Sequence, residues 1–154
     1  DIDGLVLAAP YFGVTHQWYY VLPVEFWGSL TNHFIHRVYK GDAFIRVKRP
    51  EAKSQIMSYR WIPAKGAASL IRIGNQAKNA DTLKSITAPV LHIHGKDDFA
   101  ASPEAAQKAV AKMSSKQKTT LLLENSDHHI FWDYDREQVS EVILKFVCDI
   151  DTTP

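Results

Sequence analysis

The sequence has 154 residues, a length that corresponds to one domain or to part of a larger one. Hydrophobic residues make up 45% and charged residues 23%, as in ordinary globular proteins, and the formal net charge is +1. This near-neutral and evenly mixed charge gives no reason to expect nucleic acid or an anionic membrane as a partner.

Two further features of the chain limit its class. No apolar run approaches the ~20 residues that a membrane span needs. The single cysteine, Cys148, excludes a disulfide framework within the chain and favours a cytoplasmic location. Its apolar helical surroundings predict a buried residue that acts as a small hydrophobe. The chain opens on Asp1 rather than Met, so a targeting signal upstream of it stays an open question.

Three short apolar runs predict buried strands, at residues 5–9, 90–93 and 119–123. Each run lacks alternation and ends in a turn signal. Continuous apolar runs are typical of a parallel sheet that is covered on both faces. The expected fold class is therefore α/β.

Two helices are predicted beside these strands. Ser102 is a good N-cap and Pro103 fits the first helical position, so a helix follows the second strand. A strand, a helix and a further strand imply a right-handed crossover and a parallel pair. A last helix is expected from about Asp135 or Arg136. One of its faces is apolar and should pack on the sheet: Val139, Val142, Ile143, Phe146, Val147 and Ile150.

The middle of the chain differs from both ends. Residues 11–80 hold 12 of the 17 aromatic residues, contain no convincing strand, and show one helical pattern over residues 70–77, which Gly74 weakens. We expect residues 14–80 to form a cap or lid, inserted into a core of residues 1–13 and 81–154. The alternative is that these aromatics form a second small core.

Two polar loops follow the second and third predicted strands. Residues 94–99 contain Asp97 and Asp98, and residues 125–129 contain His128 and His129. Ligands bind at the carboxyl ends of parallel strands, so a carboxylate and an imidazole should meet there. A hydroxyl nucleophile needs an adjacent base, and histidine titrates near neutrality. A buried carboxylate then fixes the tautomer of that histidine.

The same two loops carry a resemblance to a known family. Residues 86–98, Ile-Thr-Ala-Pro-Val-Leu-His-Ile-His-Gly-Lys-Asp-Asp, resemble the acid-bearing segment of α/β hydrolases, where two residues separate His-Gly from the catalytic Asp. Residues 123–133 resemble the histidine segment, with Asp127 in place of the usual small residue before the histidine. The opening residues 4–10 look like the strand that follows the nucleophile helix. The resemblance is to the branch of monoacylglycerol lipases, carboxylesterases and lysophospholipase-like proteins.

This resemblance implies a fold and a pair of catalytic residues. The chain would be the C-terminal portion of an α/β-hydrolase parallel sheet with a helical cap insertion. Asp98, rather than Asp97, would be the acid, and His128, rather than His129, the base. The order of acid and then histidine fits the chain order Ser, Asp, His of this fold.

The nucleophile of such a triad is missing. No Gly-x-Ser-x-Gly occurs, and Ser29, which follows Gly28, lies in the cap region rather than in a strand-to-helix turn. The resemblance therefore implies a serine and an oxyanion hole upstream of this chain. The expected function is hydrolysis of carboxylic esters or lipid-like acyl substrates. Five aromatics are predicted to contact the substrate: Trp18, Tyr19, Phe26, Trp27 and Phe99.

Three alternatives stay open. The same triad serves acyltransferases and thioesterases. A second alternative is an inactive fragment or an interaction module, whose open sheet edge associates with another copy or with the missing N-terminal part. A zinc site is chemically conceivable, but neither a metal nor a cofactor is expected, because the hydrolase pattern already explains His94. The residues that would form that zinc site are His92, His94, Asp97, Asp98, His128 and His129.

Overall fold

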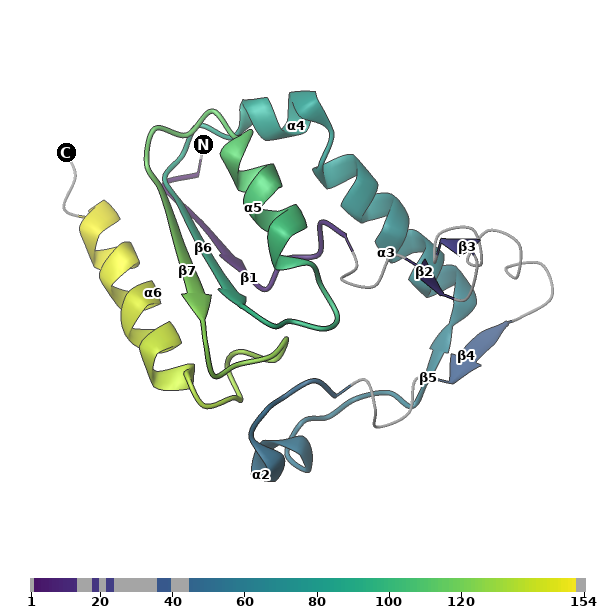
Figure 1. Cartoon of the computed structure of the whole chain (residues 1–154). Helices are drawn as coiled ribbons and strands as arrows, with labels where there is room; N and C mark the ends of the chain where they lie inside the picture. Colours follow the sequence, from purple (N-terminus) through teal and green to yellow (C-terminus); the bar gives the residue numbers. More distant parts are fainter. Residues whose placement is uncertain (1, 14–17, 20–21, 24–35, 40–44, 152–154) are drawn as a thin grey trace.

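Three parallel strands form the largest sheet in the part of the chain that the structure describes (Figure 1). The computed structural model describes residues 2–13, 18–19, 22–23, 36–39 and 45–151. Strands β1 (Leu5–Ala8), β6 (Val90–Gly95) and β7 (Lys118–Leu123) lie in the order β1-β6-β7. The predicted parallel sheet is confirmed, and β6 extends two residues further than its apolar run.

Helices cover both faces of this sheet. Helix α5 (Pro103–Ala111) lies on one face and α6 (Arg136–Asp151) on the other (Figure 1). Successive strand residues point to opposite faces. Val90 therefore packs in the cluster that includes Ala106 of α5, whereas Leu91 packs in the cluster that includes Val139 of α6. Every residue of β6 is buried, which explains why its apolar run lacks alternation. Most residues of β7 are exposed, so the prediction of a buried strand there was wrong.

Helix α5 begins as its sequence predicts. The Ser102 hydroxyl accepts a hydrogen bond from the Ala105 N–H at 3.1 Å, and Pro103 occupies the first turn. This cap satisfies an N–H group that has no partner within the helix. The helix connects β6 to β7 and so makes the predicted crossover.

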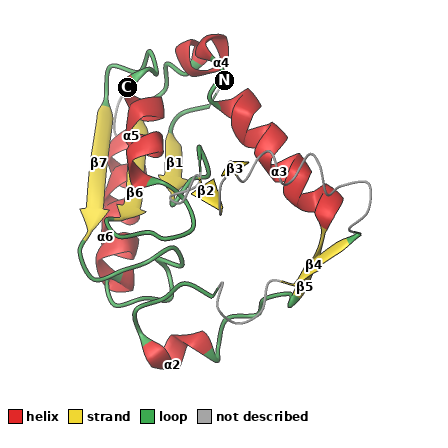
Figure 2. Ribbon diagram, turned by 45° about the vertical axis from the view of Figure 1, so that its right-hand side comes forward, coloured by secondary structure: helices red, strands yellow, loops and turns green. Residues whose placement is uncertain are grey.

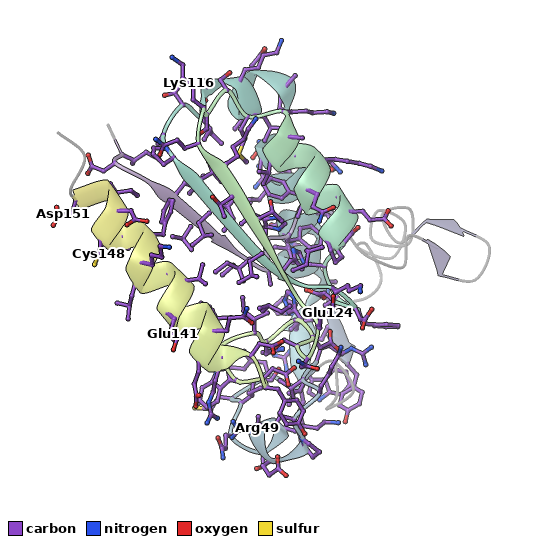
Figure 3. All side chains as sticks on the ribbon, turned by 60° about the vertical axis from the view of Figure 1, so that its left-hand side comes forward. Arg49, Lys116, Glu124, Glu141, Cys148 and Asp151 are labelled. Atoms are coloured by element: carbon purple, nitrogen blue, oxygen red, sulfur yellow. The ribbon has the colours of Figure 1, made fainter. Side chains whose placement is uncertain are left out.

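Helix α6 also begins where predicted, but its outer face differs from the expectation. Cys148 is exposed and Val147 is 53% exposed, so the prediction that both are buried was wrong (Figure 3). Cys148 follows the fully buried Val139 by nine residues, which at 3.6 residues per turn places it about 180° around the helix. The apolar surroundings of Cys148 in the sequence are therefore neighbours in the chain and not in space.

The middle of the chain contains short strands that the sequence did not predict. Strand β2 (Trp18–Tyr19) pairs with β3 (Leu22–Pro23), and β4 (Arg37–Tyr39) pairs with β5 (Trp61–Pro63), both antiparallel. The expectation of no strand in this region was wrong. Pairs of two or three residues are too short for a period-two pattern to be recognised.

Among the described residues, three helices lie in this region and directly after it. These are α2 (Pro50–Lys53), α3 (Ala64–Ala77) and α4 (Ala80–Ser85). Helix α3 is longer than the predicted pattern and runs through Gly74 without a break. A side chain at Gly74 would meet the ring of Tyr11 at 2.8 Å, so close packing against that ring explains the glycine.

The described helices of the insertion lie at two different places relative to the sheet. Helix α3 runs outward from the layer of strands, with β4 and β5 at its far end (Figure 2). Helix α2 lies beyond the carboxyl ends of the strands (Figure 2). The segment that precedes α2 is thereby brought close to the loops that follow β6 and β7.

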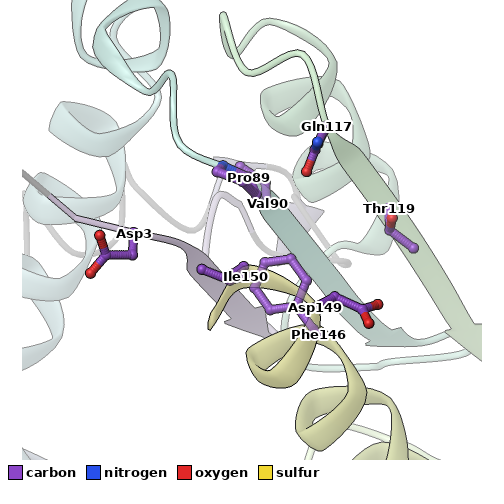
Figure 4. A pocket seen from close by; sticks show the side chains of 8 residues that line it. All are labelled: Asp3, Pro89, Val90, Gln117, Thr119, Phe146, Asp149 and Ile150. Carbon is purple, nitrogen blue, oxygen red and sulfur yellow. The ribbon is translucent and has the colours of Figure 1, made fainter. Parts of the chain in front are cut away.

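The opposite rim of the sheet carries a separate pocket of about 390 Å³ (Figure 4). It lies by the amino ends of β6 and β7, where Pro89, Gln117 and Thr119 face Phe146 and Ile150 of α6. The loops with Asp98 and His128 are at the other end of the same strands. Within the described ranges, no helix is both long and apolar enough to pass through a bilayer.

Candidate active site

The loops that follow β6 and β7 touch each other at Gly95. In the register of the two strands, Gly95 lies opposite Leu123. A Cβ atom at Gly95 would lie 2.5 Å from the carbonyl oxygen of Ser126 and 2.8 Å from that of Asp127. Only glycine permits this approach, and the approach brings the histidine loop onto the acid loop.

Asp98 is buried and held by four hydrogen-bond donors. Its Oδ1 accepts from the N–H groups of Ala100 at 2.7 Å and Ala101 at 2.9 Å. Its Oδ2 accepts from His128 Nδ1 at 2.8 Å and from His94 Nε2 at 3.0 Å. The residue as a whole is 1% exposed.

These contacts decide the charge of Asp98. Burial by itself raises the pKa of a carboxyl group, because it disfavours the charged form. Here the hydrogen bonds from His128 and His94, with that of the Ala101 N–H, outweigh burial and hold the pKa of Asp98 well below its ordinary value. The group is therefore an ionised, acceptor-only partner for the two imidazoles.

His128 is oriented by this carboxylate. Because Asp98 Oδ2 can only accept, His128 Nδ1 carries the proton of the neutral ring, and Nε2 has the lone pair. The His128 side chain is 32% exposed, so the ring has access to a reacting group. His129 is turned elsewhere, since both its backbone N–H and its Nδ1 donate to the carbonyl of Arg46, at 3.0 and 3.1 Å.

Asp127, which replaces the usual small residue, joins the two loops. Its Oδ1 accepts from the N–H of Phe99 at 3.0 Å and from the N–H of His128 at 2.8 Å. Its Oδ2 lies 3.6 Å from Arg46 Nε, and the Arg46 guanidinium lies 3.9 Å above the Phe99 ring. The sequence marked Asp127 as a departure from the family pattern but gave it no role.

A second carboxylate, Asp133, ties the insertion to the histidine loop. It is fully buried and accepts hydrogen bonds from four backbone N–H groups at 2.7 to 3.0 Å. Two of these donors, Lys48 and Arg49, belong to residues 46–49, which we call the docked segment. The other two are Asp127 of the histidine loop and Tyr134, which directly follows Asp133 in the chain.

Lys48 adds to this attachment. Its Nζ donates to the carbonyl of Glu124 at 2.8 Å and forms an ion pair with Asp97 at 3.1 Å. Asp97 therefore binds the docked segment rather than a histidine, in contrast to Asp98. No local pattern in the sequence pointed to the docked segment, because its backbone N–H groups bond to a side chain more than 80 positions away.

The residues predicted to contact substrate are only partly placed. Phe99 is 49% exposed beside the acid loop. Trp18 and Tyr19 are described only as part of β2, and Phe26 and Trp27 lie outside the described residues. Their contact with substrate stays a prediction.

The histidines considered for zinc occupy a different arrangement. Among the parts of the chain that the structure describes, no group of three or more His, Cys, Asp or Glu side chains is placed to hold a metal ion. His92 and His94 instead form hydrogen bonds within the core. Two features of the sequence could have pointed to these hydrogen bonds. His94 precedes Asp98 by four residues, and His92 is a histidine in an otherwise apolar strand.

A parallel sheet whose adjacent loops join a buried carboxylate to a histidine is the arrangement of an α/β hydrolase. The chain belongs to the hydrolase family described as "Serine aminopeptidase, S33", whose sequence model matches residues 1–135. This family membership confirms the resemblance read from the sequence.

Solved structures show the same fold. The chain is similar to a structure reported for the metagenome-derived lipolytic enzymes LipS and LipT, with a TM-score of 0.80 and 21% identity over 96% of this chain. It is also similar to a monoacylglycerol lipase of Paleococcus ferrophilus (TM-score 0.80, 19% identity, 97% of this chain). A soluble variant of the monoglyceride lipase of Saccharomyces cerevisiae gives a TM-score of 0.77 at 18% identity, again over 97% of this chain.

These similarities concern part of each relative. The chain spans 56%, 60% and 56% of the lengths of these three structures. No curated protein matches the sequence.

Proposed function

We propose that this chain supplies the acid and the base of a serine hydrolase that acts on carboxylic esters or lipid-like acyl substrates. The hydrogen bond of 2.8 Å between Asp98 Oδ2 and His128 Nδ1 carries the proposal. The lipolytic enzymes among the similar structures support an ester substrate over a peptide.

In this proposal His128 Nε2 takes the proton of a serine hydroxyl as that oxygen attacks the ester carbonyl. His128 then returns the proton to the alcohol that leaves. Asp98 stays ionised throughout, holds the ring and stabilises the imidazolium. Water attacks the acyl-enzyme in the second half of the reaction with the same help from His128, which releases the acid and restores the serine.

The serine and the oxyanion hole are proposed to lie in a segment that precedes residue 1. Strand β1 supports this, because among the described residues it pairs on one side only, with β6. A strand of the preceding segment would pair with its open edge and bring the nucleophile near His128. We further propose that residues 14–80 act as a cap over the substrate, with Phe99 at its edge.

A fluorophosphonate probe tests the nucleophile. The complete protein is treated with the probe, digested, and searched by mass spectrometry for the modified peptide. We expect one labelled serine, within a Gly-x-Ser-x-Gly sequence upstream of residue 1, and slow labelling in His128→Ala. Labelling of Ser29, or labelling that His128→Ala does not slow, would contradict the proposal.

The substrate class is tested with the same protein. Turnover of p-nitrophenyl butyrate should exceed turnover of an aminoacyl p-nitroanilide. The matching family is described as a serine aminopeptidase, so the opposite order would move the proposal from esters to peptides.

A further inference from the structure

A line of hydrogen bonds continues from Asp98 into the core between the sheet and α5. His94 and His92 are both fully buried and lie two residues apart on β6, so they point to the same face. His94 Nε2 lies 3.0 Å from Asp98 Oδ2, and His92 Nε2 lies 3.1 Å from His94 Nδ1. On β7, Thr120 Oγ1 lies 3.4 Å from His92 Nδ1.

The partners fix the position of each proton on this line. His94 Nε2 faces two atoms that only accept, Asp98 Oδ2 and the carbonyl oxygen of Ala101 at 3.3 Å, so Nε2 carries a proton. In the neutral ring, His94 Nδ1 is then bare and accepts from His92 Nε2–H. The Thr120 hydroxyl completes the line by donating to His92 Nδ1.

His92 is held in the neutral form that this arrangement needs. Burial, and next the repulsion that His94 would exert if both rings were protonated, lower the pKa of His92 to about 4. A neutral His92 has one donor and one acceptor nitrogen, and both are used. Each group on the line therefore donates a hydrogen bond to the next group nearer to Asp98.

We propose that His94 is a positioning residue for Asp98, and that His92 and Thr120 hold His94 in the tautomer that can donate to it. This rests on the proposed function, in which Asp98 orients His128. Two backbone N–H groups hold Oδ1, and His94 holds Oδ2 from the core side. The carboxylate is thus prevented from turning away from His128, and small misplacements of a catalytic group are costly.

Two substitutions separate this role from that of a satisfied core residue. Gln in place of His94 can still direct an N–H group at Asp98, whereas Leu fills the space with no donor. A histidine that merely fills the core would be replaced by Leu at least as well as by Gln. A positioning histidine would be replaced by Gln and not by Leu.

The first arm of the test is NMR of the complete protein labelled with ¹⁵N-histidine. The protons on the imidazole nitrogens are read from long-range couplings and assigned with single variants among the seven histidines of this chain. We expect the proton on Nε2 in His92 and His94, and on Nδ1 in neutral His128. Any other proton position on His92 or His94 near pH 7 would overturn the proposed line. This arm does not depend on turnover, so it stands even if the proposed function fails.

The second arm measures ester hydrolysis by the complete enzyme. His94→Leu should lower kcat on the order of 10²-fold with little change in KM, and His94→Gln should stay close to wild type. The low-field signal of the His128 Nδ1–H proton should persist in His94→Gln and be lost in His94→Leu. Thermal unfolding shows whether each variant is folded. If His94→Leu does not fold, the test rests on the activity of His94→Gln and on the NMR spectrum of the wild-type protein. A folded His94→Leu enzyme with wild-type kcat would overturn the proposal.

Discussion

Asp98 and Asp97 are adjacent in the chain and opposite in environment. Asp98 is buried under four donors, whereas the Asp97 side chain is 69% exposed and pairs with Lys48. Only Asp98 can orient His128, so the spacing from Gly95 that favoured Asp98 agrees with the geometry.

This contrast gives the first prediction. Asp98→Asn in the complete enzyme should lower kcat for ester hydrolysis by roughly 10⁴-fold, because an amide no longer selects the Nδ1–H tautomer of His128. Asp97→Asn is the matched control and should leave kcat nearly unchanged, since an exposed ion pair contributes little. Steady-state kinetics on p-nitrophenyl butyrate measures both, and equal losses in the two variants would contradict the assignment.

His92 gives a prediction about pH and stability. Its pKa is lowered from 6.5 to about 4 in the folded protein, so between these values the unfolded chain binds a proton that the folded chain does not. The free energy of unfolding should therefore fall as the pH is lowered from about 6.5 to 4, by up to ~1.4 kcal/mol per pH unit from this group. Below pH 4 both states bind the proton and its contribution stops changing.

Urea unfolding at a series of pH values measures this effect. Other groups titrate in the same range, so the slope must be compared between wild type and His92→Gln. Between pH 4 and 6.5, the free energy of unfolding should depend less steeply on pH in the variant, by up to ~1.4 kcal/mol per pH unit. An identical slope in both proteins would show that His92 is not held neutral by the fold.

At the residue scale, the sequence predicted that Asp98 and His128 meet, but it did not predict the residues that hold them in place. Asp98 and His128 were predictable because motif spacing places them directly after two adjacent parallel strands. His94 bonds to Asp98 and to His92 on its own strand, whereas Asp133 bonds in part to the docked segment. The contacts of Asp133 with Lys48 and Arg49 depend on the path of the insertion, which the local pattern of residues does not specify.

Among the elements, the docked segment has the most direct connection to the site. Residues 46–49 have no strand or helix of their own, and backbone donors to Asp133 attach them to the histidine loop. A buried donor that loses its acceptor costs about 1–3 kcal/mol. The position of this segment should therefore depend on Asp133, in addition to the contacts of Arg46 with the histidine loop and of Lys48 with Glu124 and Asp97.

Asp133→Asn tests that dependence. The amide retains one acceptor oxygen and turns an NH₂ group toward backbone N–H donors, so the free energy of unfolding should fall by at least about 2 kcal/mol. Amide hydrogen exchange at Lys48 and Arg49 should become faster. Glu141→Gln, an exposed change on α6, is the control and should alter neither measurement. Unchanged exchange at Lys48 and Arg49 in Asp133→Asn would contradict the role given to this carboxylate.

The elements differed in how well the sequence predicted them. The strands of the sheet, the start of α5 and the start of α6 follow from continuous apolar runs, a Ser-Pro cap and helical periodicity. The prediction that Val147 and Cys148 of α6 are buried was wrong, because apolar content alone does not give the rotation of a helix about its axis. The antiparallel pairs of the insertion were missed, because each contains only two or three residues per strand.

For the whole molecule, the proposed upstream serine and the edge of β1 that no described strand covers lead to one prediction. A protein of residues 1–154 alone should give no ester turnover that His128→Ala abolishes. Adding the preceding segment, in the same chain or as a separate polypeptide, should restore that turnover and raise the melting temperature by covering the edge. His128-dependent turnover by residues 1–154 alone would place the nucleophile within this chain and contradict the proposal.

The comparison of His128 with His129 tests the whole proposal in one experiment. The two rings are adjacent in the chain, but only His128 donates to Asp98, and His129 donates to the carbonyl of Arg46. In the complete enzyme, His128→Gln should lower kcat for p-nitrophenyl butyrate by at least roughly 10⁴-fold, while folded His129→Gln should keep most of it. Loss of turnover in His129→Gln with retention in His128→Gln would contradict the pairing of Asp98 with His128 as the catalytic acid and base.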